Sequence, residues 1–428
     1  MQPRETLTVD EINLSDPLFW ARPMEEREGA FATLRRERPI SFHEEPYLEG
    51  LPFPRGPGYY ALTRYHDILE VSRQPELFCS GNGSNIADLP PDFSEFFGSM
   101  INMDDPRHAR LRRIVSRGFT PRMIQRVEAD VHRAAARIVD EVIDRGEVDF
   151  VTDVAAALPL KIICDMMGIP ESEYRFIFDR TNIILGAGDP EYVSDPMAIV
   201  PALLQAGAEL SQLVQDLAHL RVKNPTDDLT SALVNAEVDG ERLTDQELGS
   251  FFVLLVVAGN ETTRNAISHG LKALTDYPDQ RERWAADFDR YAPTAVEEIV
   301  RWATPVIHFR RTATRDTEIS GQKLREGDKV VLWYCSGNRD EAKFTQPFRF
   351  DVGREPNEHV GFGGPGPHFC LGAHLARREI TMMFRELFER LPDIHVVDEP
   401  ARLQSFFIHG LKHMTARFTP GGRRAIGS

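Results

Sequence analysis

The strongest chemical signal in the sequence is one cysteine, Cys370, near the end of the glycine- and proline-rich segment 361–372, GFGGPGPHFCLG. A helical pattern begins at this cysteine and is predicted to continue to about residue 390. The positive dipole end and free N–H groups of a helix start favour thiolate over thiol. Thiolate ligates iron, and a cysteine-ligated haem favours O–O cleavage. The glycines would let the backbone pass close to such a flat cofactor.

Three other interpretations of this segment remain open from the residues alone. Gly361, Gly363 and Gly366 match the glycine spacing of the dinucleotide-binding fingerprint. That fingerprint needs a strand before the glycines and an acidic residue about 20 positions later, at the end of a second strand. The preceding segment REPNEH does not have a strand pattern, and Glu386, at the required spacing, lies in a helical pattern. His368, Cys370 and His374 could be three ligands of a zinc ion, but no fourth ligand lies at a usual spacing. The cysteine could also be purely structural.

A second candidate is AGNETT, residues 258–263, inside a predicted long helix. Thr244 and Glu247 form a capping-box pattern that opens this helix, which should end near residue 277. Glu261 and Thr262 are costly in a core unless they are paired or used. Thr262 can bond back to the carbonyl of Ala258 and bend the helix, which would leave a hydroxyl and a carboxylate suited to proton delivery. The alternative is an exposed Glu261 and a Thr262 that packs on a neighbouring helix.

A third set is polar and structural. Glu298 and Arg301, in EIVR, can pair at i, i+3 on one helix. Arg349, in FTQPFRF, is predicted to add a second arginine and lock a buried cluster.

The sequence patterns around these residues predict mostly helices, and hence a mainly α protein with small β-sheets. We expect a single domain over residues 1–420 and a disordered tail over 421–428. The 50 basic and 66 acidic side chains give a net charge of −16, which argues against nucleic-acid binding and adsorption to anionic membranes. The longest apolar run is too short for a membrane span, and four scattered cysteines favour the cytoplasm.

Taken in order, AGNETT, EIVR, FTQPFRF and GFGGPGPHFCLG resemble the cytochrome P-450 superfamily over nearly the whole chain. The resemblance implies one cytochrome P-450 fold with haem b between the long central helix and the cysteine helix. It implies that Cys370 is the thiolate ligand of the iron and that Glu261 and Thr262 deliver protons to O2 chemistry. It further implies haem contacts from His108, Arg112, Arg311, His368, Ala258, Gly259, Phe362, Gly364 and Gly372. Glu298, Arg301 and Arg349 would hold the haem-loop region.

The haem loop is one residue longer than the common loop, with eight steps from Phe362 to Cys370. This loop, together with GAFATLRRERPISF, LPLKIICDMMGIP, FFVLLVVAGNETTRNAI and APTAVEEIVRWATPV, resembles a bacterial subgroup. That subgroup contains soluble ω-hydroxylases of methyl-branched lipids, some of which oxidise the side-chain terminus of sterols such as cholesterol or cholestenone. The implied electron source is NAD(P)H through a ferredoxin reductase and a ferredoxin, since no redox domain is appended.

The 26 phenylalanines suit a pocket for a hydrocarbon. The candidate lining residues are Ile86, Phe96, Phe97, Met100, Phe252, Leu255, Val256, Val306, Phe309, Phe406 and Phe407. A ferredoxin could dock on a basic face made of Arg107, Arg110, Arg112, Arg113, Arg117, Arg377 and Arg378. The other functions considered are a cytochrome P-450 acting on a terpenoid or polyketide, a haem-binding sensor without turnover, and a zinc-binding helical protein.

Overall fold

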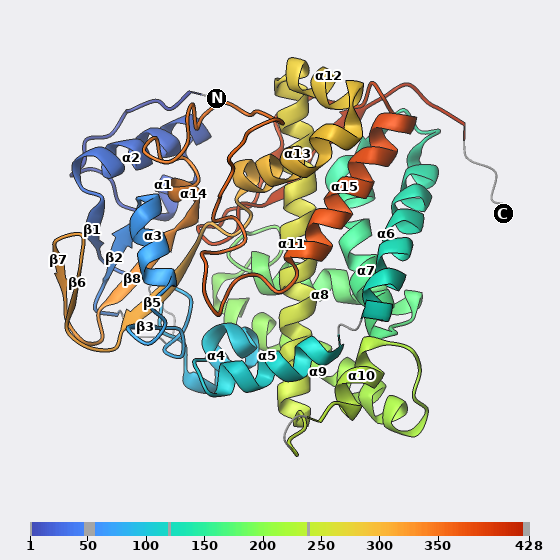
Figure 1. The fold of residues 1–428 in the computed structure, drawn as a ribbon, viewed down its shortest axis with the longest axis horizontal. Coiled ribbons are helices and arrows are strands. Elements are labelled where there is room, and N and C mark those ends of the chain that lie inside the picture. Colours follow the sequence, from blue (N-terminus) through green and yellow to red (C-terminus); the bar gives the residue numbers. More distant parts are fainter. Residues whose placement is uncertain (1, 47–55, 119–120, 238–239, 423–428) are drawn as a thin grey trace.

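A long helix, α11 (Asp245–Asp276), runs through the middle of the protein and carries AGNETT (Figure 1). The computed structural model describes residues 2–46, 56–118, 121–237 and 240–422. Thr244 caps α11 as predicted: its hydroxyl accepts from the Glu247 N–H at 3.1 Å, and the Glu247 carboxylate accepts from the Thr244 N–H at 2.9 Å. The helix ends one residue before Tyr277, because Pro278 begins the next helix.

Helices form most of the molecule and surround α11 on several sides (Figure 1). Those before it are α1 (Pro17–Trp20), α2 (Met24–Glu37), α3 (Tyr65–Ser72), α4 (Pro91–Gly98), α5 (Arg107–Gly118), α6 (Pro121–Val142), α7 (Ala157–Met167), α8 (Tyr174–Gly186), α9 (Ile199–Lys223) and α10 (Leu229–Asn235). Those after it are α12 (Pro278–Ala286), α13 (Phe288–Ala303), α14 (Tyr334–Gly337) and α15 (Ala373–Arg390). Short turns of other helix types are η1 (Ser99–Asn102), η2 (Val151–Ala155), η3 (Glu171–Glu173) and η4 (Pro196–Ala198).

The strands gather into small sheets, the largest on one side of the helical part (Figure 1). This sheet has the order β1-β2-β8-β5-β3 and contains β1 (Ile40–His43), β2 (Tyr59–Leu62), β8 (Lys329–Trp333), β5 (His308–Ala313) and β3 (Phe78–Cys79). Only β2 and β8 are parallel within it. The remaining strands are β4 (Glu147–Asp149), β12 (Thr415–Arg417) and β9 (His395–Val396) in one sheet, β10 (Ala401–Arg402) with β11 (Leu411–His413), and β6 (Thr317–Ile319) with β7 (Gln322–Leu324). The predicted mainly α fold with small sheets is therefore confirmed.

The main core lies along α11, where α6, α7, α9, α13 and α15 contribute buried apolar side chains. Two smaller clusters lie around the large sheet. In the chain, β5 of the large sheet follows α13. Helix α15 begins just after Cys370 and packs against α11. The chemistry-bearing segments thus come from elements far apart in the sequence.

One stretch, Pro196–Lys223, is long and apolar enough to cross a membrane by length and composition. It comprises η4 and α9, and 28% of its most apolar window is buried inside the protein. A single helix of this kind is weak evidence for a membrane span.

Candidate haem site

Cys370 lies in the turn before α15, with Gly372 as the residue that precedes the helix. The prediction that the helix begins at Cys370 is therefore three residues early. Cys370 is an exposed residue, yet surrounding protein desolvates its thiol and raises the pKa of that thiol. The N–H groups of Gly372 and Ala373 and the charges of Arg112 and Arg377 act in the opposite direction. An accessible sulfur that is also enclosed by protein lies in a recess, and the donors around it stabilise a thiolate.

The middle of α11 presents an accessible stripe although both neighbouring faces are buried. Ala258 is exposed, and Leu255, Gly259 and Thr262 are half-buried, at the i, i+3, i+4, i+7 spacing of one helix face. Thr262 donates its hydroxyl to the Ala258 carbonyl at 2.6 Å, as predicted. An open stripe in a core helix leaves room beside it for a large planar group. No Cβ added at Gly372 would meet another atom within 4 Å, so the backbone after Cys370 also borders open space.

Glu261 lies on a different face of α11 from Thr262. Its carboxylate is 1% exposed, pairs with Arg264 three residues later, and accepts a 3.0 Å hydrogen bond from Asn265. The structure therefore places the two members of the predicted proton-delivery pair in different environments. Thr262 borders the open stripe, whereas Glu261 is held in the core by its own helix.

Four basic or imidazole groups come together between α5, β5 and the loop before α15. The rings of His108 and His368 lie 4.4 Å apart between centroids. Burial, followed by the charges of Arg311, His108 and Arg112, lowers the pKa of His368 to about 3. His108 Nε2 is buried without a hydrogen-bond partner. Closely spaced donors with an unpartnered buried nitrogen fit a group that carries carboxylates, as the haem propionates do.

Arg112 has a second role in this cluster. Its guanidinium donates to the carbonyls of Pro367 and Phe369 at 2.7 and 2.8 Å. These bonds fasten the residues just before Cys370 to α5. Arg311 donates to the carbonyl of Arg310 at 2.7 Å and is 6% exposed. The described residues thus fit haem: a recessed thiol, an open helix stripe and a cluster of carboxylate-binding groups.

Two of the glycines predicted to contact the cofactor also allow close packing within the protein. A Cβ at Gly364 would lie 2.4 Å from the Ser72 hydroxyl of α3. A Cβ at Gly259 would lie 2.3 Å from Ile163 of α7. At both positions the missing side chain makes room for a neighbouring element, and the haem contacts predicted for these two glycines stay predictions. Phe362 is half-buried and packs against the main core.

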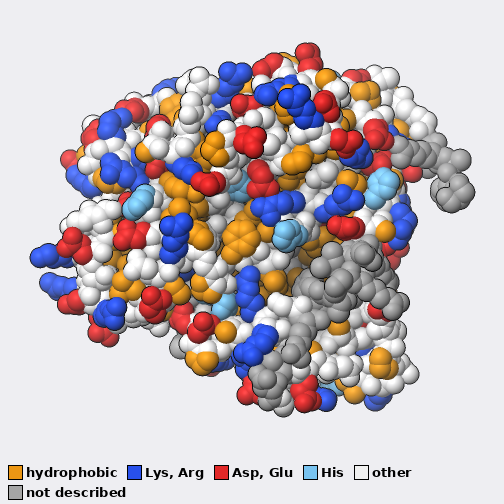
Figure 2. Space-filling view, viewed as in Figure 1, with side chains coloured by type: hydrophobic (Ala, Val, Ile, Leu, Met, Phe, Trp, Pro, Cys, Tyr) orange, Lys and Arg blue, Asp and Glu red, His pale blue; other side chains and the backbone are white. Residues whose placement is uncertain are grey.

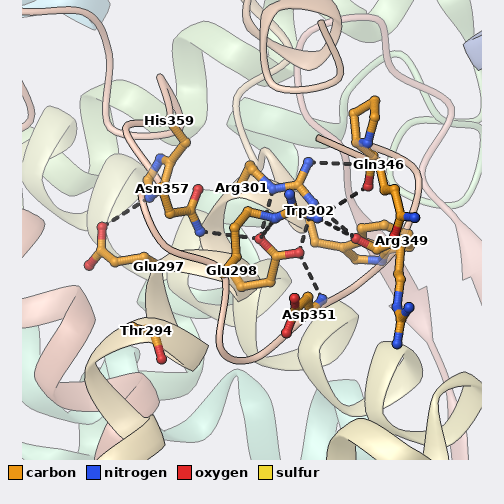
Figure 3. Close-up of polar contacts among 12 residues, drawn as sticks. Thr294, Glu297, Glu298, Arg301, Trp302, Gln346, Arg349, Asp351, Asn357 and His359 are labelled. Carbon is orange, nitrogen blue, oxygen red and sulfur yellow. Dashed lines mark hydrogen bonds and ion pairs between the residues drawn. The ribbon is translucent and has the colours of Figure 1, made fainter. Parts of the chain in front are cut away.

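The predicted Glu298–Arg301 pair is present and fully buried, with nitrogen–oxygen distances of 2.7 Å (Figure 3). Its second arginine is Arg354, whose Nε donates to Glu298 at 3.0 Å. Arg349 contributes only its backbone carbonyl, while its side chain points away from Glu298 and lies 3.7 Å from Asp279 on the surface (Figure 3). The prediction that the Arg349 side chain locks this cluster is therefore wrong. The chain turns at Asp351, and this turn brings Arg354 back to the carboxylate.

The apolar candidates for a substrate pocket divide into two groups. Four are buried in core clusters: Ile86, Met100, Phe252 and Val256. Seven are partly exposed: Phe96, Phe97, Leu255, Val306, Phe309, Phe406 and Phe407. Helix geometry explains the difference on α11, because Leu255 shares the open stripe whereas Phe252 and Val256 pack into the core.

Four of the partly exposed candidates meet where β5 passes the loop between β10 and β11. Val306 forms an isolated bridge with Ile408, and the Phe309 and Phe407 rings lie 5.6 Å apart. His308 lies among these aromatic side chains, 5.5 Å from Phe407 and 5.9 Å from Phe406 between ring centroids. Sequence reasoning missed His308, whose only local signal was its place in the VIHF segment.

Sequence reasoning also missed two acids near the cysteine helix. Glu297, beside the expected Glu298, contacts Arg377 of α15. Glu379 of α15 is buried, and burial raises its pKa to about 8 despite a hydrogen bond from Thr263. The doubled acid in AVEEIVR was a usable signal for Glu297, whereas the burial of Glu379 depends on how α15 meets α11.

The predicted basic face is partly neutralised. Arg107 pairs with Glu95, and Arg110 pairs with Glu247 and Glu241. Figure 2 shows basic side chains and histidines around an apolar area over the loop before α15. Phe369, next to Cys370, is 38% exposed. The side chain of Arg117 lies outside the described residues.

The structure does not support the other interpretations of the cysteine segment. Within the described ranges, the group of possible metal ligands with atoms within 4.8 Å of one another is His66, Asp67 and Glu70, which excludes His368, Cys370 and His374 from a shared zinc site. Residues 352–360 before the glycines form turns rather than a strand. A dinucleotide fingerprint therefore lacks its strand.

Comparison with known proteins agrees with the geometry. The cytochrome P-450 family model matches residues 205–392. Methyl-branched lipid omega-hydroxylases of Mycobacterium bovis and Mycobacterium tuberculosis are 54% identical over 413 residues, covering 96% of this chain and 95% of theirs. A steroid C26-monooxygenase of Mycobacterium bovis is 40% identical, with 95% of this chain and 93% of that protein covered. A solved Mycobacterium marinum cytochrome P-450 in complex with pseudoionone has a TM-score of 0.91 and 46% identity, covering 98% of this chain and all of that one.

Proposed function

Because this chain belongs to the cytochrome P-450 family of haem monooxygenases, we propose that it hydroxylates the terminal methyl group of methyl-branched lipids. The side-chain terminus of a sterol is a second substrate class, by similarity to the steroid C26-monooxygenase. The observation that carries the proposal is the high identity to the lipid omega-hydroxylases over nearly the full length of both chains. The mostly apolar candidate pocket residues suit a hydrocarbon.

When bound, haem supplies the centre at which O2 is activated so that one oxygen atom enters a C–H bond. In our proposal Cys370 holds the iron as a thiolate, supported by the N–H groups of Gly372 and Ala373. His108, Arg112, Arg311 and His368 hold the propionates, an assignment that rests on their mutual proximity and on the unpartnered His108 Nε2.

The proton-handling role is assigned to Thr262 and Glu261. The Thr262 hydroxyl donates its proton to the Ala258 carbonyl. The lone pairs of Thr262 Oγ1 are therefore free to accept a hydrogen bond from a proton donor in the open stripe. Glu261 must leave its pairing with Arg264 before it can serve Thr262. Arg264 therefore restrains the acid, and proton supply requires a side-chain movement on α11.

Terminal oxidation requires shape to choose the carbon, because a primary C–H bond is harder to break than a secondary one. We propose that the aromatic side chains at the β5 and β10–β11 contact, Phe309 and Phe407 among them, restrict the reacting chain to an end-on approach. In this proposal Leu255 and Ala258, on the open stripe of α11, form another side of the pocket.

Electrons are proposed to come from NAD(P)H through a ferredoxin reductase and a ferredoxin in the cytoplasm. The docking face would lie on the cysteine side, around Arg113 and Arg378. Charge reversal at Arg113 should slow reduction by a ferredoxin most at low ionic strength. An unchanged rate at every salt concentration would refute this docking face.

The test of the function is product analysis with the holoprotein, a ferredoxin and its reductase. A methyl-branched fatty acid, its straight-chain analogue, cholestenone, a terpenoid and a polyketide serve as parallel substrates, and Cys370→Ser is the inactive control. We expect the terminal alcohol as the main product from the branched acid. Mainly in-chain alcohols would contradict terminal selectivity, preferential oxidation of a terpenoid or polyketide would contradict the substrate class, and haem binding without product would indicate a sensor.

A further inference from the structure

Two ion pairs connect the same two helices, α13 and α15. Glu297 pairs with Arg377 at 2.5 Å, and Asp289 pairs with Arg385 at 2.5 Å. The pairs are eight residues apart on each helix, which is about 12 Å along the axis. The Glu297–Arg377 pair lies at the end of α15 nearer to Cys370, and the other pair lies farther along.

Arg377 is close enough to Cys370 to act on its sulfur. The Arg377 guanidinium lies over the Phe362 ring at 4.5 Å from its centroid, and the Phe362 carbonyl accepts from the Cys370 N–H at 3.0 Å. The charge of Arg377 also lowers the pKa of Cys370. A cation at this place withdraws electron density from a thiolate.

Glu297 holds Arg377 there and opposes its charge. The carboxylate binds Arg377 through both oxygens and also contacts His359 Nε2 at 3.0 Å (Figure 3). His359 Nδ1 accepts from the Gly361 N–H, so the ring proton is on Nε2 and points to Glu297. Burial opposes ionisation of Glu297, but the bonds from His359 and Arg377 lower its pKa to about 2. Glu297 is thus a permanent anion that ties both ends of the haem loop to α13.

We propose that Glu297 is a positioning residue that sets, through Arg377, how strongly the Cys370 thiolate donates to haem iron, and hence the reduction potential of the haem. The inference rests on the proposed function, because it requires haem on Cys370. It assigns to Glu297 and Arg377 opposite effects: loss of the anion favours the reduced haem, and loss of the cation disfavours it.

The test is spectroelectrochemical titration of the purified holoproteins carrying Glu297→Gln, Arg377→Gln and both changes. We expect the one-electron reduction equilibrium to move about three- to tenfold toward the reduced form in the first variant and by a similar factor away from it in the second. A tenfold change corresponds to 59 mV for one electron. The double variant should lie between the two, and Arg377→Lys should remain near the wild type because it keeps the charge.

Asp289→Asn is the matched control, because it breaks an ion pair between the same helices farther from the sulfur. Its potential should equal that of the wild type. If Glu297→Gln and Arg377→Gln shift the potential in the same direction, or neither shifts it, the pair is only a structural tie and the proposal is wrong. The carbon monoxide difference spectrum of the wild type is read first: absence of the far-shifted thiolate band would refute the proposed function itself, whereas a normal band with unshifted variants refutes only this inference.

Discussion

The Glu298 cluster gives a sharp contrast between two arginines five residues apart. Glu298 is fully buried and accepts from Arg301, Arg354, Asn357 and the Asp351 N–H. The Arg354 side chain is 9% exposed, whereas the side chain of Arg349 is 54% exposed and its partner Asp279 is 62% exposed. Arg354→Ala should therefore be destabilising, and Arg349→Ala should be nearly neutral.

The expected magnitudes follow from burial. Arg354→Ala removes the hydrogen bond to the buried Glu298 carboxylate, which still pairs with Arg301, and three hydrogen bonds to backbone carbonyls in the segment 345–349. We expect a cost of about 2 to 3 kcal/mol in the free energy of unfolding. Arg349→Ala removes an exposed pair worth about 0 to 0.5 kcal/mol. With an unfolding entropy of about 2.1 cal/mol/K per residue over 428 residues, the first change lowers Tm by about 3 °C and the second by less than about 1 °C.

Thermal unfolding of the two holoproteins, followed by circular dichroism and by haem absorbance, measures this difference. Both variants keep the backbone carbonyl of residue 349 and its hydrogen bond from Arg301, so they differ in which arginine side chain is removed. An equal loss of Tm in the two variants would refute the assignment of Arg354 to the cluster. So would a larger loss for Arg349→Ala.

Three further outcomes are expected. Thr262→Ala should bind substrate normally but form less product for each NAD(P)H consumed, measured as the ratio of alcohol to oxidised cofactor; an unchanged ratio would remove Thr262 from proton handling. Glu379→Gln should gain Tm relative to the wild type as the pH rises from about 4.5 to 8, because burial raises the pKa of Glu379 and its ionised form destabilises the fold; a difference that is independent of pH would contradict this. Cys370→Ser should lose the far-shifted carbon monoxide band while keeping the far-ultraviolet circular dichroism of the wild type, and retention of the band would exclude Cys370 as the iron ligand.

Local sequence patterns were sufficient to predict contacts between residues of the same helix. The Thr244 capping box, the Thr262 bond to Ala258 and the Glu298–Arg301 pair each join residues three or four apart, so the sequence predicted them correctly. The order of the motifs likewise predicted the fold, because the resemblance extends over nearly the whole chain.

Contacts that depend on tertiary packing could not be predicted in this way. Arg354 reaches Glu298 only because the chain turns after residue 350, and nothing in the spacing distinguishes it from Arg349. The face on which Glu261 lies could have been inferred, since Arg264 is three residues away on the same helix. The contacts of Gly259 and Gly364 depend on Ile163 and Ser72, which belong to other helices.

Residues 364 and 72 are sterically coupled, because a Cβ at Gly364 would collide with the Ser72 side chain. Ser72 donates its hydroxyl to the Ile68 carbonyl at 2.7 Å, and its own carbonyl would lie 2.4 Å from a Cβ at Gly366. Any larger residue at position 72, or any side chain at 364 or 366, needs a compensating change in the other segment. Transfer of this one-residue-longer haem loop into a related enzyme would therefore also require transfer of the end of α3.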